Sequence, residues 1–227
     1  MNTQESKPKG YRYFHIVAMF FVASLLIANT VAVKVITFAG FAIPAGILCF
    51  PIAYIVNDVL TEVYGFKKAK SVIWWGFISL AFMTLTYHLA TIIKPAGFWQ
   101  DQAAFEAIFS VVPRIALGSL IAFVVGSFLN SIVLSKMKIW MQGKQLWMRT
   151  IGSTIVGEGV DSIIFNIVAF AGIFAFNDLI TIIWSGFLLK TLYEVVATPL
   201  TYIVVGFLKR KEEEDAYDTG VNYNPFT

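Results

Sequence analysis

Ionisable side chains recur inside stretches of this sequence that are otherwise apolar enough to cross a membrane. They occur in closely spaced pairs: Asp58 with Glu62, Glu158 with Asp161, and Lys190 with Glu194. A charged side chain at the centre of a bilayer costs roughly 2.5–3.5 kcal/mol, so such residues usually face a polar interior or one another. Several of them in one small chain predict a bundle that encloses a polar site. This favours transport or intramembrane chemistry over a plain anchor.

The spacing within each group indicates how its side chains are presented. Asp58 and Glu62 lie four residues apart and share one face of a helix, with Asn57 beside them as a further polar group. Glu158 and Asp161 lie three residues apart in a run flanked by glycines, which permit close approach of another helix or of a flat ligand. These two acids would lie about 10–15 Å into the bilayer, at 1.5 Å per residue. Such a depth is hard to explain without a partner.

Several of these residues have a structural interpretation as well as a functional one. Lys190 and Glu194, again four residues apart, either neutralise each other or leave Glu194 facing the polar interior. Glu62 either faces that interior or reaches the membrane surface, and Arg114 is either an interfacial anchor or a site residue. Asn166, a further turn along from Asp161, could add an amide. The expected substrate-binding residues are Asn57, Asp58, Glu62, Arg114, Glu158, Asp161, Asn166, Lys190 and Glu194.

Carboxylates in a dry interior attract cations or groups rich in N–H donors. A carboxylate can accept two parallel hydrogen bonds from a planar, amidine-like edge, as it does from arginine. The Watson–Crick edge of a guanine-type base offers this geometry through N1–H and its exocyclic amine, and spare acids could hold a cationic substituent or a proton. No P-loop, dinucleotide fingerprint or zinc motif occurs in the sequence, the single Cys49 cannot form an internal disulfide, and we expect no cofactor.

The elements that position these residues follow from composition. The chain has 227 residues, of which 58% are hydrophobic and 14% charged, which is too apolar for an ordinary soluble domain. Stretches of about 20 apolar residues indicate membrane-spanning helices. We expect six, at 14–36, 42–64, 71–93, 113–135, 151–175 and 180–208. The predicted class is therefore an all-α integral membrane protein, and two inverted three-helix halves are one arrangement of it.

The net charge of +3 is better explained by orientation than by nucleic acid. If the helices alternate, most lysines and arginines outside the spans fall on one side of the membrane, and that side is cytoplasmic by the positive-inside rule. Both termini are therefore expected in the cytoplasm, with tails at 1–11 and 209–227 around a transmembrane domain at 12–208. The charge run from Glu212 to Asp215 is expected to be solvated.

Local signals refine this picture. Pro44 and Pro51 predict that the second span is kinked or partly unwound. Residues 99–110 could form a short interfacial helix, and Pro113 would start the fourth span, where its missing N–H costs nothing.

Three motifs resemble a known family, the queuosine precursor transporters, also called the vitamin uptake transporter family. The first is Phe50-Pro51 with Asn57-Asp58-Val59-Leu60-Thr61-Glu62-Val63-Tyr64-Gly65. The second is Trp147, Arg149 and Gly152-Ser153-Thr154, running into Gly157-Glu158-Gly159-Val160-Asp161-Ser162 and Phe165. The third is Tyr193-Glu194-Val195 with Thr198-Pro199-Leu200. The resemblance extends from about residue 14 to the Asn-Pro-Phe tail at 224–226.

The resemblance implies a six-helix importer in the inner membrane, similar in architecture to the substrate-binding subunits of energy-coupling-factor vitamin transporters. Its substrates would be 7-cyano- or 7-aminomethyl-7-deazaguanine, or the free base queuine. The cavity residues it implies are Asp58, Glu62, Arg114, Glu158, Asp161 and Glu194. Partners would be the small-molecule base and the lipid bilayer, with a homodimer or an energising subunit as alternatives.

Other functions stay open at this point. The chain could be the binding subunit of a transporter energised by another protein, since it has no nucleotide motif of its own. It could be an intramembrane aspartyl protease, with Asp58 and Asp161 sharing a proton, although the glycine-flanked Asp161 run is one residue too long for the known signature. A purely structural membrane protein is the third alternative, and it predicts that neutralising the acids would not impair transport.

Overall fold

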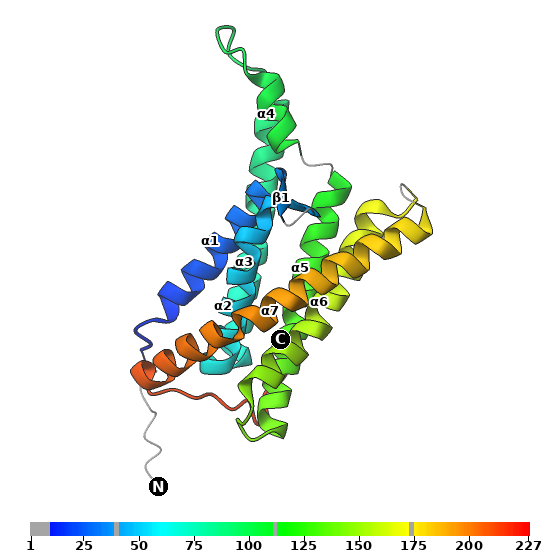
Figure 1. Cartoon of the computed structure of the whole chain (residues 1–227). Helices are drawn as coiled ribbons and strands as arrows, with labels where there is room; N and C mark the ends of the chain where they lie inside the picture. The colour runs from blue at the N-terminus through cyan, green and yellow to red at the C-terminus, as the bar shows by residue number, and fades with distance from the viewer. Residues whose placement is uncertain (1–9, 39–40, 111–112, 173–174) are drawn as a thin grey trace.

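Seven α-helices and one short β-hairpin make up the described part of this chain, shown as a computed structural model in Figure 1. The structure describes residues 10–38, 41–110, 113–172 and 175–227. The helices are α1 (Phe14–Val31), α2 (Phe50–Tyr64), α3 (Phe66–Ile92), α4 (Gln102–Phe109), α5 (Pro113–Trp140), α6 (Leu146–Phe170) and α7 (Phe176–Glu212). The expected helical class is confirmed, and the hairpin is an addition that the sequence did not predict.

Five of these helices, α1, α3, α5, α6 and α7, are long and apolar enough to cross a membrane. They correspond to five of the six expected spans, and they make this a multi-pass membrane protein. The exception is the expected span at 42–64. Its helix α2 has 15 residues and a length of about 22 Å, less than the ~30 Å of a hydrocarbon core. The count of six spans therefore stays a prediction, as does the division into inverted halves.

The first part of that expected span is the second strand of a hairpin and a 3₁₀ turn rather than a continuous helix. Strands β1 (Val35–Phe38) and β2 (Phe41–Pro44) pair antiparallel, and the 3₁₀ helix η1 (Ala45–Leu48) follows. The paired positions are Val35 with Pro44, Ile36 with Ile43, Thr37 with Ala42 and Phe38 with Phe41. Pro51 then lies in the first turn of α2, where its missing N–H is tolerated. The expected partial unwinding upstream of α2 is confirmed.

Helices α5 and α6 lie side by side because glycines line their contact. A Cβ atom on Gly126 would lie 2.8 Å from the Cβ of Asp161, and one on Gly157 would lie 2.8 Å from the carbonyl oxygen of Gly126. Small residues of this kind let helix backbones approach closely in membranes. The close approach brings the polar side chains of α5 onto α6.

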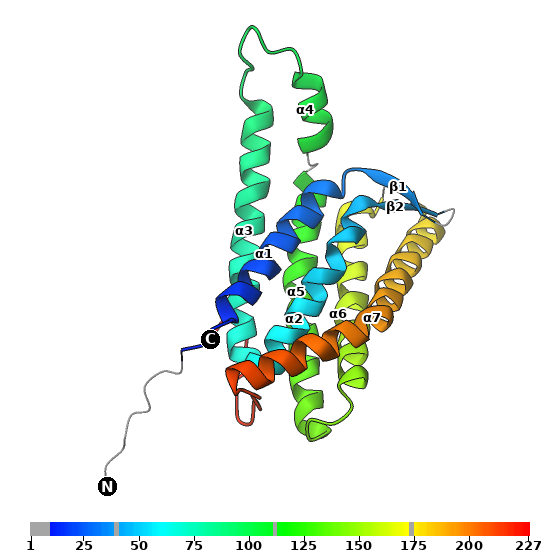
Figure 2. The same ribbon diagram turned by 60° about the vertical axis from the view of Figure 1, so that its left-hand side comes forward.

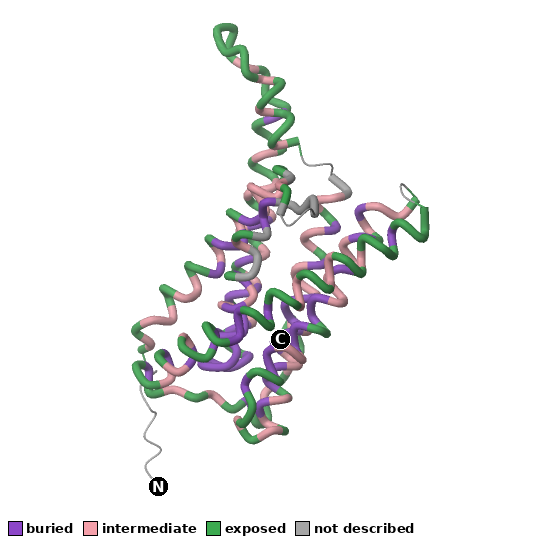
Figure 3. The backbone as a smooth tube through the Cα atoms, viewed as in Figure 1, coloured by how far each residue is buried: buried purple, intermediate pink, exposed green. Residues whose placement is uncertain are grey.

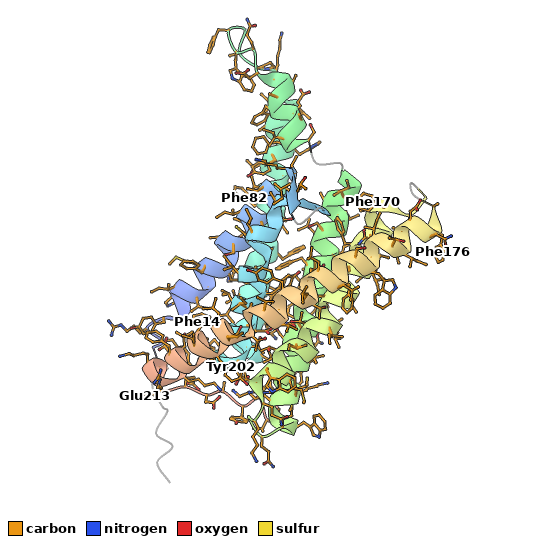
Figure 4. All side chains as sticks on the ribbon, in the orientation of Figure 1. Phe14, Phe82, Phe170, Phe176, Tyr202 and Glu213 are labelled. Carbon is orange, nitrogen blue, oxygen red and sulfur yellow. The ribbon has the colours of Figure 1, made fainter. Side chains whose placement is uncertain are left out.

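Helix α7 crosses the bundle obliquely and contacts α6 and α2 (Figure 2). It has 37 residues and is about 56 Å long, so it must tilt or extend beyond the bilayer. Its outward side is exposed and apolar, as at Trp184, Val196 and Ile203. Phe176 at its start and Phe82 on α3 are also largely exposed (Figure 4). Such side chains suit contact with lipid.

Burial is greatest where α2 is enclosed by its neighbours (Figure 3). Val59, Leu60 and Val63 of α2 are at most 1% exposed and belong to the main apolar cluster. A second face of the same helix carries buried polar side chains, namely Asn57, Asp58, Thr61 and Glu62. A short central helix, polar on one face and surrounded by longer helices, is the element that positions the site.

Lys209, Arg210 and Lys211 lie in the last turn of α7, at the end of the molecule where α1 begins (Figure 1). Gly65, with φ 81°, turns α2 into α3 there in a single residue. Lys138 and Lys209, from distant parts of the sequence, both pair with Asp215. This agrees with the one-sided charge pattern of the sequence. Its assignment to the cytoplasm stays a prediction, and Lys7 and Lys9 lie outside the described residues.

Candidate functional site

A lysine on α7 is held between two acids of α6. Lys190 Nζ lies 2.9 Å from Glu158 Oε2 and 2.7 Å from Asp161 Oδ2. The ring of Tyr54 on α2 has its centroid 5.9 Å from the same ammonium, and the Tyr54 hydroxyl donates a hydrogen bond to Glu158. The charge of Lys190 is therefore neutralised between helices. The alternative in which it pairs with Glu194 on its own helix is wrong.

Asp58 on α2 is bound by an amide instead of a cation. Asn130 on α5 donates from Nδ2 to Asp58 Oδ1 over 2.6 Å. Asp58 is 1% exposed and Asn130 3%, yet Asp58 Oδ2 and Asn130 Oδ1 have no hydrogen-bond partner among the described residues. A buried polar atom left without a partner costs about 1–3 kcal/mol. Both oxygens are thus available to a ligand that brings donors.

Glu194 on α7 extends this set of acceptors. It is 2% exposed, and its Oε1 atom has no hydrogen-bond partner in the part of the chain that the structure describes. Its charge interacts with those of Asp58 and Glu158, so the three carboxyls lie near one another although they belong to three helices. We call Asp58, Glu158, Asp161, Lys190 and Glu194 the central cluster.

Glu62 belongs to a second network at the basic end of the molecule. It is fully buried, with Oε2 2.5 Å from Arg149 and Oε1 2.6 Å from Lys209 and 3.4 Å from Lys138. Three cations therefore surround one carboxylate. We call Glu62, Lys138, Arg149, Lys209 and Asp215 the basic-end network. This arrangement supports a structural interpretation of Glu62 more than a contact with substrate.

The C-terminal residues complete the basic-end network. Asp215 pairs with Lys138 and, at 2.8 Å, with Lys209. Partial burial raises the pKa of Asp215, but hydrogen bonds from both lysines outweigh it and hold the pKa below that of an ordinary aspartate. Glu212 accepts a hydrogen bond from the backbone N–H of Tyr13 over 2.6 Å. The expectation of a solvated charge run is therefore wrong for Glu212, which is 5% exposed, whereas Asp215 is ion-paired but stays 44% exposed.

Three expected site residues lie apart from the central cluster or outside the described side chains. Asn57 exchanges hydrogen bonds with Ser131 on α5, at 3.3 and 3.4 Å, and so joins α2 to α5. Asn166 is 6% exposed and donates to the Ser162 carbonyl, while its Oδ1 atom has no partner. Arg114 lies in the first turn of α5, and its side chain is outside the described part of the structure.

Two residues of the site were not predicted from the sequence. Asn130 had a detectable signal, because polar residues recur every three or four positions along one face of α5. These residues, all buried, are Ser127, Asn130, Ser131, Ser135 and Lys138. Tyr54 lies one turn before Asp58, but a tyrosine in a membrane segment is common and gave no comparable signal.

The chemistry of the central cluster is that of a hydrogen-bond acceptor. Among the described residues, no group of three or more His, Cys, Asp or Glu side chains is arranged to hold a metal ion. The unpartnered acceptors in and beside the cluster are Asp58 Oδ2, Asn130 Oδ1 and Glu194 Oε1, and Asn166 Oδ1 is a further one along α6. They come from α2, α5, α6 and α7, so a ligand that donates to several of them would be enclosed by the bundle.

Comparisons with known proteins agree on one family. The family model described as "Putative vitamin uptake transporter" matches residues 44–204. A Bacillus subtilis protein named "Probable queuosine precursor transporter" is 34% identical over 176 residues, 77% of this chain and 77% of that protein. The "Queuosine precursor transporter" of Escherichia coli is 22% identical over 165 residues, 73% of this chain and 72% of that protein. No solved structure matches the chain.

Proposed function

The chain belongs to the vitamin uptake transporter family, and we propose that it imports queuosine precursors across the inner membrane. The family is one of transporters and not of enzymes. The precursors are 7-deazaguanine bases: the 7-cyano or 7-aminomethyl compound, or queuine. Support comes from the names of the Bacillus subtilis and Escherichia coli relatives and from the chemistry of the central cluster.

The observation that carries this proposal is the set of buried oxygens without partners. A 7-deazaguanine base is flat and rich in donors, since it presents N1–H, an exocyclic amine and the pyrrole N–H. Asp58 Oδ2 and Glu194 Oε1 are buried acceptors that lack such donors. A carboxylate that accepts two parallel bonds from the N1–H and amine edge is the strong form of this contact. The site would therefore select for the guanine-like edge.

Lys190 would supply the complementary donor. Its ammonium lies between Glu158 and Asp161. Because the Lys190 side chain is 28% exposed, a ligand within the bundle can reach the ammonium. The O6 carbonyl of the base is an acceptor and would suit this ammonium. Asn166 Oδ1 offers a further acceptor on α6.

The experiment is uptake of labelled precursors into cells that cannot synthesise queuosine. We expect precursor-dependent queuosine in tRNA with the wild-type protein and a loss of at least tenfold in Asp58→Asn and Asp161→Asn. Asp178→Asn is the matched control, because Asp178 is an exposed acid in the first turn of α7. All variants are compared at equal amounts in the membrane fraction.

The outcomes separate the function from the site. Normal uptake by both variants would keep the function and refute the central cluster as its site. Absence of uptake by well-expressed wild type would contradict autonomous import, and a pull-down for an energising subunit would follow. The aspartyl protease alternative gains no support, because Asp161 pairs with Lys190 and is thereby occupied by a cation.

A further inference from the structure

We propose that the carboxyls of Asp58 and Glu194 bind one proton, which is carried into the cell together with each base. This inference rests on the proposed function and extends it, since it assigns a second, ionic ligand to the central cluster. Three observations support it: the charges present, the burial of these two groups, and the lack of a cationic partner for either among the described side chains.

Apart from Asp215, the titratable groups of the central cluster and of the basic-end network, with Tyr54, come from four helices. They are Tyr54, Asp58 and Glu62 on α2, Lys138 on α5, Arg149, Glu158 and Asp161 on α6, and Lys190, Glu194 and Lys209 on α7. In α1 the titratable residue is the exposed His15. In α3 the lysines lie at the basic end, and Tyr87 and His88 lie at the opposite end. These do not compensate the acids of the central cluster.

The basic-end network holds three cations and two anions, which pair with one another. Glu62 and Asp215 together pair with Lys138, Arg149 and Lys209. That network has no anion left unpaired, and its cations are already engaged. The central cluster is different, because Lys190 is the one cation that its four carboxyls share among the described side chains.

Within the central cluster, Asp58 and Glu194 are the two carboxyls that do not pair with Lys190. Lys190 is engaged by Glu158 and Asp161, and Glu158 also accepts a hydrogen bond from Tyr54. Of the ion pairs formed among the described residues, none includes Asp58 or Glu194. Both are at least 98% buried, at 1% and 2% exposure.

Two buried carboxylates without cations are unstable as a pair of anions. Removing one such ion from water costs several kcal/mol even after the protein relaxes, and like charges nearby add to this cost. A carboxyl in that position takes up a proton instead, as two acids that share a site do. Asp58 Oδ2, Asn130 Oδ1 and Glu194 Oε1 are unpartnered oxygens that can accept a hydrogen bond from the protonated carboxyl.

Binding of the base gives this proton a role in transport. One neutral base and one proton enter from outside, the proton forms an O–H bond on one carboxyl, and the other carboxylate accepts donors from the base. Asp58 lies one turn from Glu62, so opening the basic end would admit water to the pair. Water solvates the ionised carboxylate, and the O–H bond breaks as the proton passes to water and leaves with the base into the cytoplasm.

The test uses the purified full chain in liposomes with labelled 7-cyano-7-deazaguanine as the probe, because the aminomethyl compound carries its own charge. The membrane potential is clamped at zero, and the external solution is made about one pH unit more acidic than the liposome interior. One-to-one coupling then predicts that the base accumulates inside to about ten times its external concentration. A dye inside the liposomes should report acidification on addition of the base, and a protonophore should abolish both effects.

The variant Glu194→Gln replaces the carboxyl with a neutral group of the same shape. We expect the ratio of its uptake with and without the pH gradient to fall to about one, whatever its residual rate. If the variant does not transport, binding by purified protein is the readout: wild-type affinity for the cyano base should change with pH and that of Glu194→Gln should not. Asp178→Asn should keep the wild-type ratio.

Results that overturn the proposal differ from those that overturn the function. Exchange of labelled for unlabelled base by wild type, with no response to the pH gradient and no acidification, would refute the proton site and leave the import function intact. A gradient response retained in Glu194→Gln would refute the assignment to this pair. Absence of any exchange would refute both proposals.

Discussion

Asp58 and Glu62 show how little the residue type alone says about role. They lie one turn apart on the same face of α2, and both are essentially fully buried. Glu62 is surrounded by Arg149, Lys138 and Lys209, whereas Asp58 has an amide, Asn130, and a free oxygen. In the first arrangement both oxygens of the Glu62 carboxylate pair with cations, and these pairs hold helices together. In the second, the free oxygen of Asp58 can accept a hydrogen bond from a ligand.

This difference predicts that neutralising Glu62 affects stability before it affects recognition. In Glu62→Gln the buried Arg149 would lose its anion, and removal of one partner from a buried pair costs about 3–5 kcal/mol. We expect a markedly lower unfolding temperature in detergent. Glu106→Gln, an exposed acid on α4, should unfold like the wild type.

Asp58→Asn should show the opposite pattern, with near-normal unfolding and lost binding of the base. A Glu62→Gln protein that unfolds normally but no longer binds the base would contradict the structural role of Glu62. It would return that residue to the substrate site, where the sequence placed it.

At the level of elements, the contact between α5 and α6 decides whether Asn130 reaches Asp58. Gly126 and Gly157 allow the two backbones to approach closely, and Asn130 stands directly against Gly157. The polar side chains of α5 can contribute to the site only when the backbones of α5 and α6 lie this close together. The glycines are therefore part of the architecture of the site, although they contribute no side chain to it.

The corresponding prediction concerns Gly157→Ala. The added Cβ would lie 2.7 Å from the Cβ of Asn130 and 2.8 Å from the backbone oxygen of Gly126, so the helices must move apart. Overpacking of this kind costs about 1–3 kcal/mol, and we also expect weaker binding of the base. Unfolding in detergent and binding by the purified protein measure the two effects.

The matched control is Gly206→Ala on α7, where an added Cβ meets nothing within 4 Å. There the better helix propensity of alanine should stabilise the protein by up to about 1 kcal/mol. Equal effects of the two substitutions would contradict the importance of the α5–α6 contact.

On the scale of the whole molecule, the C-terminal residues join elements that are far apart in sequence. The Ala216 N–H donates to the Val63 carbonyl over 3.1 Å, and Asp218 accepts from the Phe66 N–H at the start of α3 over 2.9 Å. Trp74 on α3 donates to the Pro225 carbonyl over 2.9 Å. The end of the chain thus closes the basic end of the bundle instead of leaving it as a free tail.

Asp215→Asn tests this closure through its pH dependence. The pKa of Asp215 is lowered in the folded protein. Its ion pairs therefore stabilise the fold fully at pH values above the ordinary aspartate pKa of about 3.9. This stabilisation is lost as the pH falls through the lower pKa of the folded state. Because the side chain is 44% exposed, the contribution is at most about 1 kcal/mol. The difference in unfolding temperature between wild type and variant should persist at neutral pH and shrink below about pH 4. A difference in unfolding temperature that does not change with pH would contradict the stabilising role of the Asp215 ion pairs.

The sequence by itself determined the class of the protein, because apolar segments of sufficient length have no stable place outside a membrane. It also indicated the clustering of basic residues at one end and the start of α5 at Pro113. These are local properties of composition and spacing. The family motifs, read from the same residues, indicated the transporter.

Only the tertiary structure decided which charges meet. Lys190 is one turn from Glu194 yet pairs with Glu158 and Asp161 across a helix boundary, and Glu62 finds Arg149 and Lys209 at positions far along the chain. Spacing along a helix shows which side chains share a face, but ion pairing depends on the distance between helices. That distance is set here by the glycines of α5 and α6, the oblique course of α7 and the closing C-terminal residues. The polar site between α2, α5, α6 and α7 is therefore a property of their packing.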